Sequence, residues 1–281
     1  REIGDSLGDK RGRVVQFQTS LSSLVTDEQP ISVHITAHRR RGVIGKTEAE
    51  YKGTVGRMLK EMRLDRELPF DWIADSTRWM RKPRTYDSLE TMLRRTLEAY
   101  RRSLWDNQDA YVEVWLEKDA LSGVLYNVTA QWDVPLMVTR GYASLSFLAA
   151  AAETIAEAGK PAFLYYFGDF DPSGLDIPRA VETRLRELAP EAEIHFERVA
   201  VTTDQIATLR LPTRPTKATD TRSKGFVGGS VEVDAMPPNM LRVLVDTCIM
   251  RHIDQRALEV MRAAERSERV VLSRMISGIE G

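Results

Sequence analysis

The sequence predicts an α/β fold in which a mostly parallel, Rossmann-like sheet follows a smaller, mainly helical part. Three observations support this fold class. Apolar segments typical of strands alternate with helical segments from residue 110 onward, amphipathic helical patterns precede them, and hydrophobic residues make up 42% of the 281-residue chain. Alternating strands and helices of this kind place helices on both faces of a parallel sheet.

The first part of the chain is expected to contain two segments. Residues 1–30 lack periodicity and are expected to form an irregular lead-in, whereas residues 31–105 are expected to form a basic helical domain. One helix is predicted over residues 47–66, where Thr47 and Glu50 have the spacing of a capping box. A second helix is predicted over residues 86–105, because its apolar residues recur at helical spacing.

The second part, residues 106–281, is expected to form the α/β domain. Short runs rich in β-branched and aromatic residues predict strands near residues 110–116, 134–139, 162–167 and 193–201. Helices are predicted between and after them, near residues 119–131, 144–158, 178–189 and 237–265. Residues 208–230 are rich in Pro, Thr, Lys and Gly, and predict a long functional loop.

The charges are distributed unevenly along the chain, although the net charge is only −1. Residues 1–105 carry 21 Lys and Arg against 15 Asp and Glu, while the remainder is acidic. A basic segment can neutralise the phosphates of a nucleic acid. Solvated helix surfaces are the alternative explanation. The basic residues that we expect to contact DNA or phosphate are Arg39, Arg40, Arg41 and Arg78 in the basic part, and Lys224 in the long loop.

Acidic side chains follow two of the predicted strands. Glu117 follows the first strand, and Asp169 and Asp171 follow the third. Because parallel sheets bind ligands at the carboxyl ends of their strands, we expect these carboxylates to form one site. Neighbouring carboxylates repel one another unless a cation lies between them, and hard oxygen ligands favour Mg²⁺ or Mn²⁺. A solvated loop or a helix cap is the alternative for an isolated Asp-x-Asp pair.

Three ordered motifs resemble one protein family. VEVWLEKDAL at 112–121, VTRGYASLSFL at 138–148 and GDFDPSGLDI at 168–177 resemble the Toprim domain of the topoisomerase VI A subunit and of the related meiotic double-strand-break transesterase. The VEVDA run at 231–235 resembles a later element of that family. The resemblance implies that Glu117 is a metal ligand or general acid–base. It also implies that Asp169 and Asp171 hold Mg²⁺ and that Arg140 meets a phosphate.

Residues 31–51 resemble, more weakly, the winged-helix domain that precedes Toprim in the same family. That domain carries the tyrosine that attacks DNA. An alignment on Arg41 and Gly42 places Thr36 where this tyrosine is expected, and the adjacent Ile35 is not a tyrosine either. A threonine hydroxyl needs a strong neighbouring base to attack. Hydrolysis therefore fits this chain better than reversible transesterification.

These patterns predict a Mg²⁺-dependent protein that cleaves or processes DNA phosphodiesters, with Glu117, Asp169 and Asp171 as catalytic residues. The first alternative is a catalytically inactive DNA-binding or assembly subunit of a topoisomerase VI-like complex. The second is a small-molecule phosphohydrolase, which also uses Asp-x-Asp after a strand. The family resemblance implies a homodimer and a separate ATPase or other subunit as partners.

The remaining features concern the compartment. Apolar stretches are too short to cross a bilayer, so no membrane association is expected. The single cysteine, Cys248, lies in an apolar helical run and is expected to be a core thiol. A reducing, cytoplasmic location is the expectation, and association with the nucleoid if the source is bacterial or archaeal.

Overall fold

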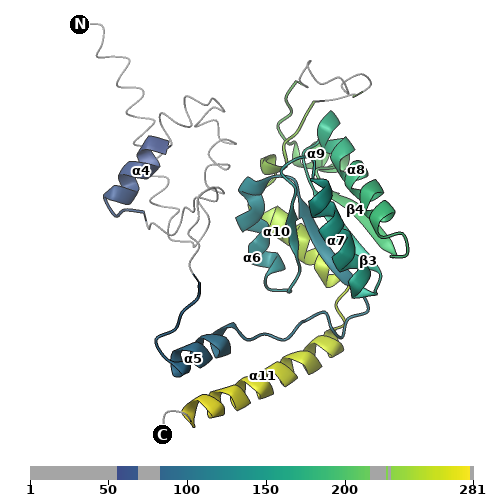
Figure 1. The fold of residues 1–281 in the computed structure, drawn as a ribbon. Coiled ribbons are helices and arrows are strands. Elements are labelled where there is room, and N and C mark those ends of the chain that lie inside the picture. The colour runs from purple at the N-terminus through teal and green to yellow at the C-terminus, as the bar shows by residue number, and fades with distance from the viewer. Residues whose placement is uncertain (1–55, 69–82, 216–225, 227–228, 279–281) are drawn as a thin grey trace, which may run out of the picture. The chain divides into compact units, whose positions relative to one another are not determined.

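The computed structural model describes residues 56–68, 83–215, 226 and 229–278. The chain divides into two compact units (Figure 1). The first unit comprises residues 1–79 and 234–239, and the second comprises residues 80–233 and 240–281. Within the first unit, helix α4 (Arg57–Leu64) buries Met58 and Met62 on one face. No helix among the described residues is long and apolar enough to cross a membrane.

The second unit is built on a four-stranded parallel sheet. Its strands are β1 (Tyr111–Leu116), β2 (Leu136–Val138), β3 (Ala162–Phe167) and β4 (Ile194–Ala200). Their order across the sheet is β2-β1-β3-β4, and every pairing is parallel. The predicted α/β class with a parallel sheet is therefore confirmed. Because β1 and β3 are adjacent central strands, the residues that follow them lie close together at the carboxyl end of the sheet.

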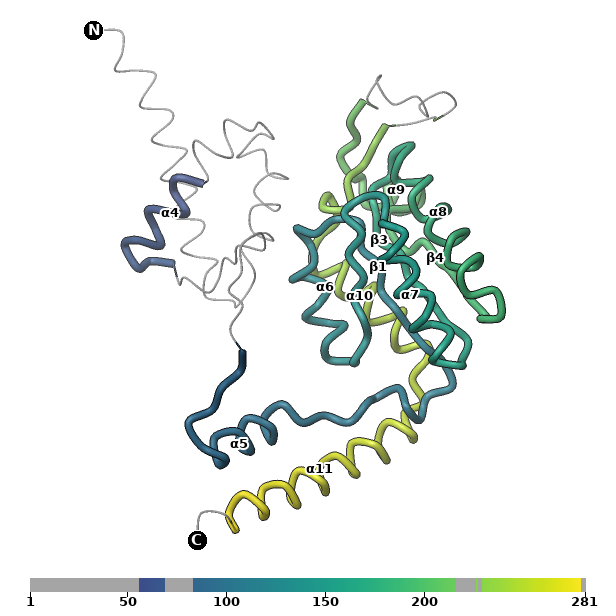
Figure 2. The backbone as a smooth tube through the Cα atoms, viewed as in Figure 1, coloured from purple at the N-terminus to yellow at the C-terminus, as the bar shows by residue number. Residues whose placement is uncertain are grey.

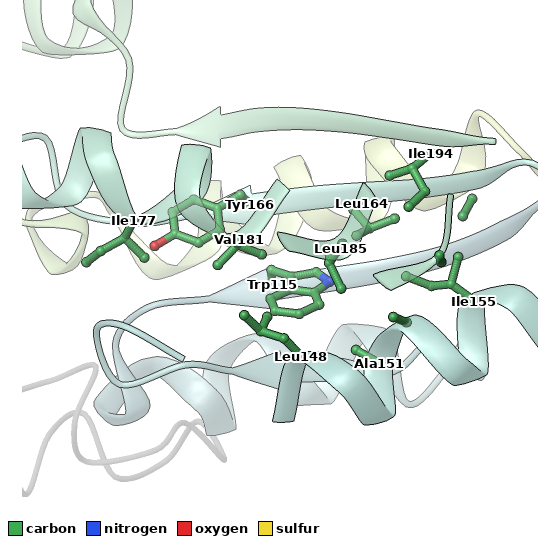
Figure 3. Close-up of a cluster of buried hydrophobic side chains, with 13 residues drawn as sticks. Trp115, Leu148, Ala151, Ile155, Leu164, Tyr166, Ile177, Val181, Leu185 and Ile194 are labelled. Carbon is green, nitrogen blue, oxygen red and sulfur yellow. The ribbon is translucent and has the colours of Figure 1, made fainter. Parts of the chain in front are cut away.

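Helices cover both faces of this sheet (Figure 1). Helices α7 (Leu145–Ala158) and α8 (Pro172–Leu188) cover one face. The core on this face centres on Trp115, Leu164 and Tyr166, which pack against both helices (Figure 3). The short helix η3 (Asp119–Leu121) leads into α6 (Ser122–Thr129), and α10 (Pro238–Met250) follows the long loop. The hydroxyl of Tyr165, on the second face of β3, lies 2.7 Å from Nε2 of His252, just after α10.

Two helices predicted within residues 106–281 differ clearly from the structure in their bounds. Helix α8 begins at Pro172 and not at residue 178, because proline suits the first turn and Asp171 caps it. The helix predicted over residues 237–265 is two helices in the structure. The first helix ends at Met250, and Asp254 caps the second, α11 (Gln255–Ser277). A further helix, α9 (Thr203–Leu209), begins with a capping box at Thr202. The short helix η5 (Val233–Ala235) precedes α10.

Helices α5 (Leu89–Ala99) and α11 lie side by side in the second unit (Figure 2). The Tyr100 hydroxyl donates a hydrogen bond to Glu268, and an Arg102 Nη1 lies 2.8 Å from the other oxygen of that carboxylate. Arg269 Nη1 donates to the Tyr100 carbonyl at 2.7 Å. The segment predicted as a helix over residues 86–105 is thus shorter than expected and packs against the C-terminal helix of the second unit.

Candidate metal and phosphate site

The ends of the two central strands are joined by hydrogen bonds. The Glu117 N–H donates to the Phe167 carbonyl at 2.9 Å, which extends the β1–β3 pairing beyond the last regular residue of β1. Two residues after Phe167, the Asp169 N–H donates to Glu117 Oε2 at 3.0 Å. The predicted proximity of Glu117 and Asp169 therefore has a direct cause, which is the parallel register of β1 and β3.

Glu117 is half-buried, and the carboxylates of Asp169 and Asp171 lie near it. Burial is the main factor that raises its pKa, and the nearby carboxylate of Asp169 raises it further. Asp171 adds to this effect, while the Asp169 N–H opposes it. A negative charge on Glu117 is therefore less favourable in the folded chain than in water. A cation beside Glu117 would stabilise its charged form.

Tyr166 and Gly168 define the space around Glu117. The Tyr166 hydroxyl donates to Glu117 Oε2, and the two oxygens are 3.3 Å apart. The Tyr166 ring is fully buried, and this burial raises the pKa of the phenol. A methyl group on Gly168 would lie 2.5 Å from Glu117 Oε2 and would also collide with the Tyr166 ring. Glycine at position 168 is therefore needed for the close approach of the β1 and β3 ends.

Asp169 is held by a late segment of the chain. The Val233 N–H donates to Asp169 Oδ1 at 2.7 Å, and Lys118 Nζ lies 4.0 Å from the same oxygen. Next to it, Phe170 pairs with Val231 in an antiparallel bridge. Residues 231–233 therefore return to the carboxyl end of the sheet and lie beside Asp169.

Asp171 has a different structural role from Asp169. It is the N-cap of α8, and its Oδ1 accepts the Gly174 N–H at 2.6 Å. The helix-cap alternative for the Asp-x-Asp pair thus applies to the second aspartate. Its charge still affects Glu117, because it contributes to the raised pKa of that carboxyl.

Lys118 and Glu232 are part of this site, and the motif analysis did not single them out. Lys118 Nζ lies 3.1 Å from Glu232 Oε2, and Arg214 Nη1 lies 3.2 Å from Glu232 Oε1. The Lys118 ammonium therefore offsets part of the negative charge of Asp169 and Glu232. The sequence signal for Glu232 is the VEVDA run, in which it is the only glutamate. Its carboxylate lies at the same end of the sheet as those of Glu117, Asp169 and Asp171.

Arg198 fixes the backbone of the site from β4. Its guanidinium donates to four carbonyls, those of Gly168 at 3.1 Å, Asp169 at 2.6 Å, Gly174 at 2.6 Å and Val201 at 3.1 Å. Burial lowers the pKa of Arg198, and the buried phenol of Tyr166 and the three carboxylates partly offset this effect. Arg198 thus connects the turn after β3 with the first turn of α8. A single arginine within a strand gives no sequence signal of this role.

The predicted phosphate contacts are only partly described. Arg140 lies after β2 with a left-handed backbone (φ 54°), and its guanidinium is 2.9 Å from Asp119 Oδ2. It is exposed, so a polyanion can reach it. Tyr142, in the same turn, donates to Asp176 of α8 at 2.6 Å. The other predicted contacts, Arg39, Arg40, Arg41, Arg78 and Lys224, lie outside the described residues, as does Thr36.

The carboxylates do not form a closed metal cage. Among the residues that the structure describes, no three acidic, histidine or cysteine side chains lie close enough together to hold a metal ion unaided. The donor chemistry nevertheless suits Mg²⁺, which keeps several waters and often takes only one or two carboxylates, with the other ligands supplied by substrate phosphates. Glu117 and Asp169 provide such a partial set.

Glu113 lies on the same strand as Glu117 but belongs to the core. It is buried, and both of its oxygens accept hydrogen bonds, from the Tyr111 hydroxyl at 2.8 Å and from Trp115 Nε1 at 2.7 Å. Burial raises its pKa. The position of Glu113, earlier in the strand, keeps it away from the edge where the candidate site lies.

Comparison with known proteins adds no relative. No protein-family model matches the chain, and a search of curated proteins finds no significant match.

Proposed function

We propose that this protein is a Mg²⁺- or Mn²⁺-dependent DNA-processing protein that acts on phosphodiesters through a Toprim-type site. The observation that carries the proposal is the hydrogen bond from the Asp169 backbone N–H to Glu117 Oε2, at the carboxyl ends of two adjacent parallel strands. This is the edge at which open parallel sheets bind their ligands. The family resemblance of the three motifs supports the same assignment.

In this proposal Glu117 and Asp169 provide protein ligands, and the nucleic-acid phosphate provides others. Asp171 adds negative charge beside them while it caps α8. When bound, a divalent cation neutralises charge on the scissile phosphate and lowers the pKa of a bound water. Lys118 lies 4.0 Å from Asp169 Oδ1, and the exposed Arg140 pairs with Asp119. Both cations would contact phosphate oxygens.

Hydrolysis by water fits the described residues better than attack by a protein hydroxyl. Tyr166 has the hydroxyl that contacts Glu117, but its ring is fully buried and burial raises its pKa. A buried phenol of this kind cannot reach the backbone of a DNA duplex. The basic segment before residue 106, with the proposed winged helix, would hold the DNA.

A second candidate function is supported by a specific contact. Lys118 Nζ lies between Glu232 Oε2, at 3.1 Å, and Asp169 Oδ1, at 4.0 Å, and the Val233 N–H also binds Asp169. Protein groups alone therefore balance part of the acidic charge. This arrangement favours a DNA-binding or assembly subunit that does not cleave, as in the first alternative from the sequence.

Cleavage of supercoiled plasmid by the full chain separates these candidates. We expect nicked or linear product in Mg²⁺, none in EDTA and none from Asp169→Asn, while Glu157→Gln on the exposed side of α7 behaves as the wild type. Gel-shift binding of the same plasmid is measured in parallel. Binding without cleavage in Mg²⁺ or Mn²⁺ would support the second candidate. Neither binding nor cleavage would contradict both.

A further inference from the structure

The outer edge of β4 is unpaired within the described residues. Strand β4 is hydrogen-bonded to β3 alone, because it is the last strand of the sheet. The Ala162 N–H donates to the Glu193 carbonyl, so alternate residues of β4 direct their backbone groups toward β3. The intervening residues Ile194 and Phe196 direct theirs outward. In agreement, the Ile194 carbonyl accepts Arg186 Nη2 at 2.8 Å from the side of α8.

A cavity of about 550 Å³ runs along this edge. Its lining comes from both faces of the sheet. Phe196 and Arg186 line it on the α8 side, while Phe163, His195 and Glu197 line it on the opposite side. A cavity that reaches both faces at an edge strand leaves room for the backbone of another extended segment. Exposed edges of this kind are the usual template for β-strand addition.

We propose that a second copy of this chain pairs its β4 antiparallel with β4, which would join the two sheets into one. The charge pattern of β4 is self-complementary about Phe196. A two-fold axis at Phe196 places His195 opposite the partner subunit's Glu197, and the same pair recurs on the other side of the axis. Opposite charges in directly opposed cross-strand pairs stabilise a sheet, and an imidazole N–H also donates to a carboxylate when it is neutral.

The alternation of the backbone agrees with this register. Because Phe196 directs its N–H and carbonyl outward, it forms a hydrogen-bonded pair with its own copy. Ile194 and the partner subunit's Arg198 form the next such pair. His195 then falls in a non-hydrogen-bonded pair, in which side chains lie closest. The pairing ends after Arg198, where Gln205 Nε2 already donates to the Val199 carbonyl at 2.8 Å.

The present contacts of these side chains do not oppose the pairing. His195 Nε2 lies 2.8 Å from Glu193 Oε1, and Glu197 Oε2 lies 3.1 Å from Arg251 Nη1. Both pairs have about half of their side-chain surface exposed, and exposed ion pairs contribute little to stability. The Ile194 carbonyl has two lone pairs, so it can keep Arg186 and accept a second donor.

Sedimentation velocity on the full chain tests the proposal. The wild type is expected to be a dimer that dissociates on dilution. The substitution His195→Glu places two carboxylates opposite each other in each of the two symmetric pairs. It is expected to raise the dimer Kd about tenfold. The double variant His195→Glu/Glu197→Lys restores opposite charges and is expected to restore the dimer. A monomeric wild type, or a dimer that His195→Glu leaves unchanged, would overturn the proposal.

Disulfide trapping tests the register independently of charge. The double variant His195→Cys/Glu197→Cys is expected to form a covalent dimer under mild oxidation, because the two positions oppose each other across the axis. The matched control Glu193→Cys/His195→Cys moves one thiol by two residues and is expected to remain uncrosslinked. The native thiol Cys248 is buried and does not interfere. Equal crosslinking of both variants, or of neither, would refute this register.

Discussion

The backbone N–H of Asp169 donates a 3.0 Å hydrogen bond to the Oε2 atom of Glu117. This bond connects the turn after β3 to the end of β1. It holds the Glu117 carboxylate beside the turn that carries Asp169. The same glutamate oxygen therefore has two functions in our account. It stabilises the turn, and it is a proposed ligand for a divalent cation.

Substitutions at Glu117 separate these two functions. In Glu117→Gln the amide oxygen still accepts the Asp169 N–H, and a charge that burial disfavours is removed. We expect unchanged or slightly increased stability. Glu117→Ala leaves a partly buried N–H without its acceptor and is expected to cost about 1–3 kcal/mol. Urea unfolding followed by circular dichroism measures both. Equal destabilisation by the two variants would show that the hydrogen bond is not what Glu117 contributes.

Glycine at position 168 is predicted to be essential for the geometry of the site. In Gly168→Ala the new methyl group would collide with Glu117 Oε2 and the Tyr166 ring, so we expect a loss of about 1–3 kcal/mol. Gly123 in α6 is the matched control, because a methyl group there meets no atom within 4 Å. Gly123→Ala is expected to gain about 0.5–1 kcal/mol, since alanine favours helix. Thermal melts of both variants check the prediction, which a neutral Gly168→Ala would contradict.

Arg198 is predicted to stabilise the site through its shape as well as its charge. Its four carbonyl partners surround one planar guanidinium, and a lysine ammonium cannot reach all of them. We expect Arg198→Lys to cost about 2–4 kcal/mol of unfolding free energy. Arg184→Lys on the exposed side of α8 should change it by less than about 0.5 kcal/mol. Similar values for the two variants would argue against this role.

Glu113 gives a prediction about pH. Burial raises its pKa above the ordinary value of 4.5, so the folded chain binds this proton more tightly than the unfolded chain. The protonated form therefore stabilises the fold at low pH, and this stabilisation is lost as the pH rises from about 4.5 through the folded pKa. Glu113→Gln stays uncharged and can keep the Trp115 hydrogen bond.

We expect Glu113→Gln to be more stable than the wild type at pH 7, by an amount of order 1 kcal/mol. The advantage should shrink as the pH falls. Denaturant titrations of both proteins between pH 4 and pH 8 provide the comparison, and taking their difference cancels the other carboxylates. A difference that stays constant with pH would mean that Glu113 has an ordinary pKa in the folded chain.

Much of the fold follows from local pattern. The alternating strands and helices after residue 110 predicted all four parallel strands, because hydrophobic periodicity is a local property. The boundaries of α8 and α10 were less predictable. Pro172 alone does not predict where α8 begins, because proline interrupts strands and is also a good first residue of a helix. The break before Asp254 interrupts an apolar pattern that continues on both sides.

The candidate site was predictable only where it follows strand ends. Glu117 and Asp169 could be placed together because the fold class fixes where parallel strands end. Glu232 and Arg198 could not, because their partners lie far away in the sequence. Lys118 contacts Glu232 across 114 residues, and Arg198 binds backbone carbonyls, which no side-chain motif records.

The central claim is that Glu117 and Asp169 bind a divalent cation together with a nucleic-acid phosphate. Electron paramagnetic resonance of Mn²⁺, titrated into the full chain with a DNA duplex, tests it most directly. We predict saturable binding by the wild type, at least about tenfold weaker binding by Asp169→Asn, and wild-type binding by the control Glu157→Gln. Equal Mn²⁺ binding by the wild type and Asp169→Asn would contradict the account.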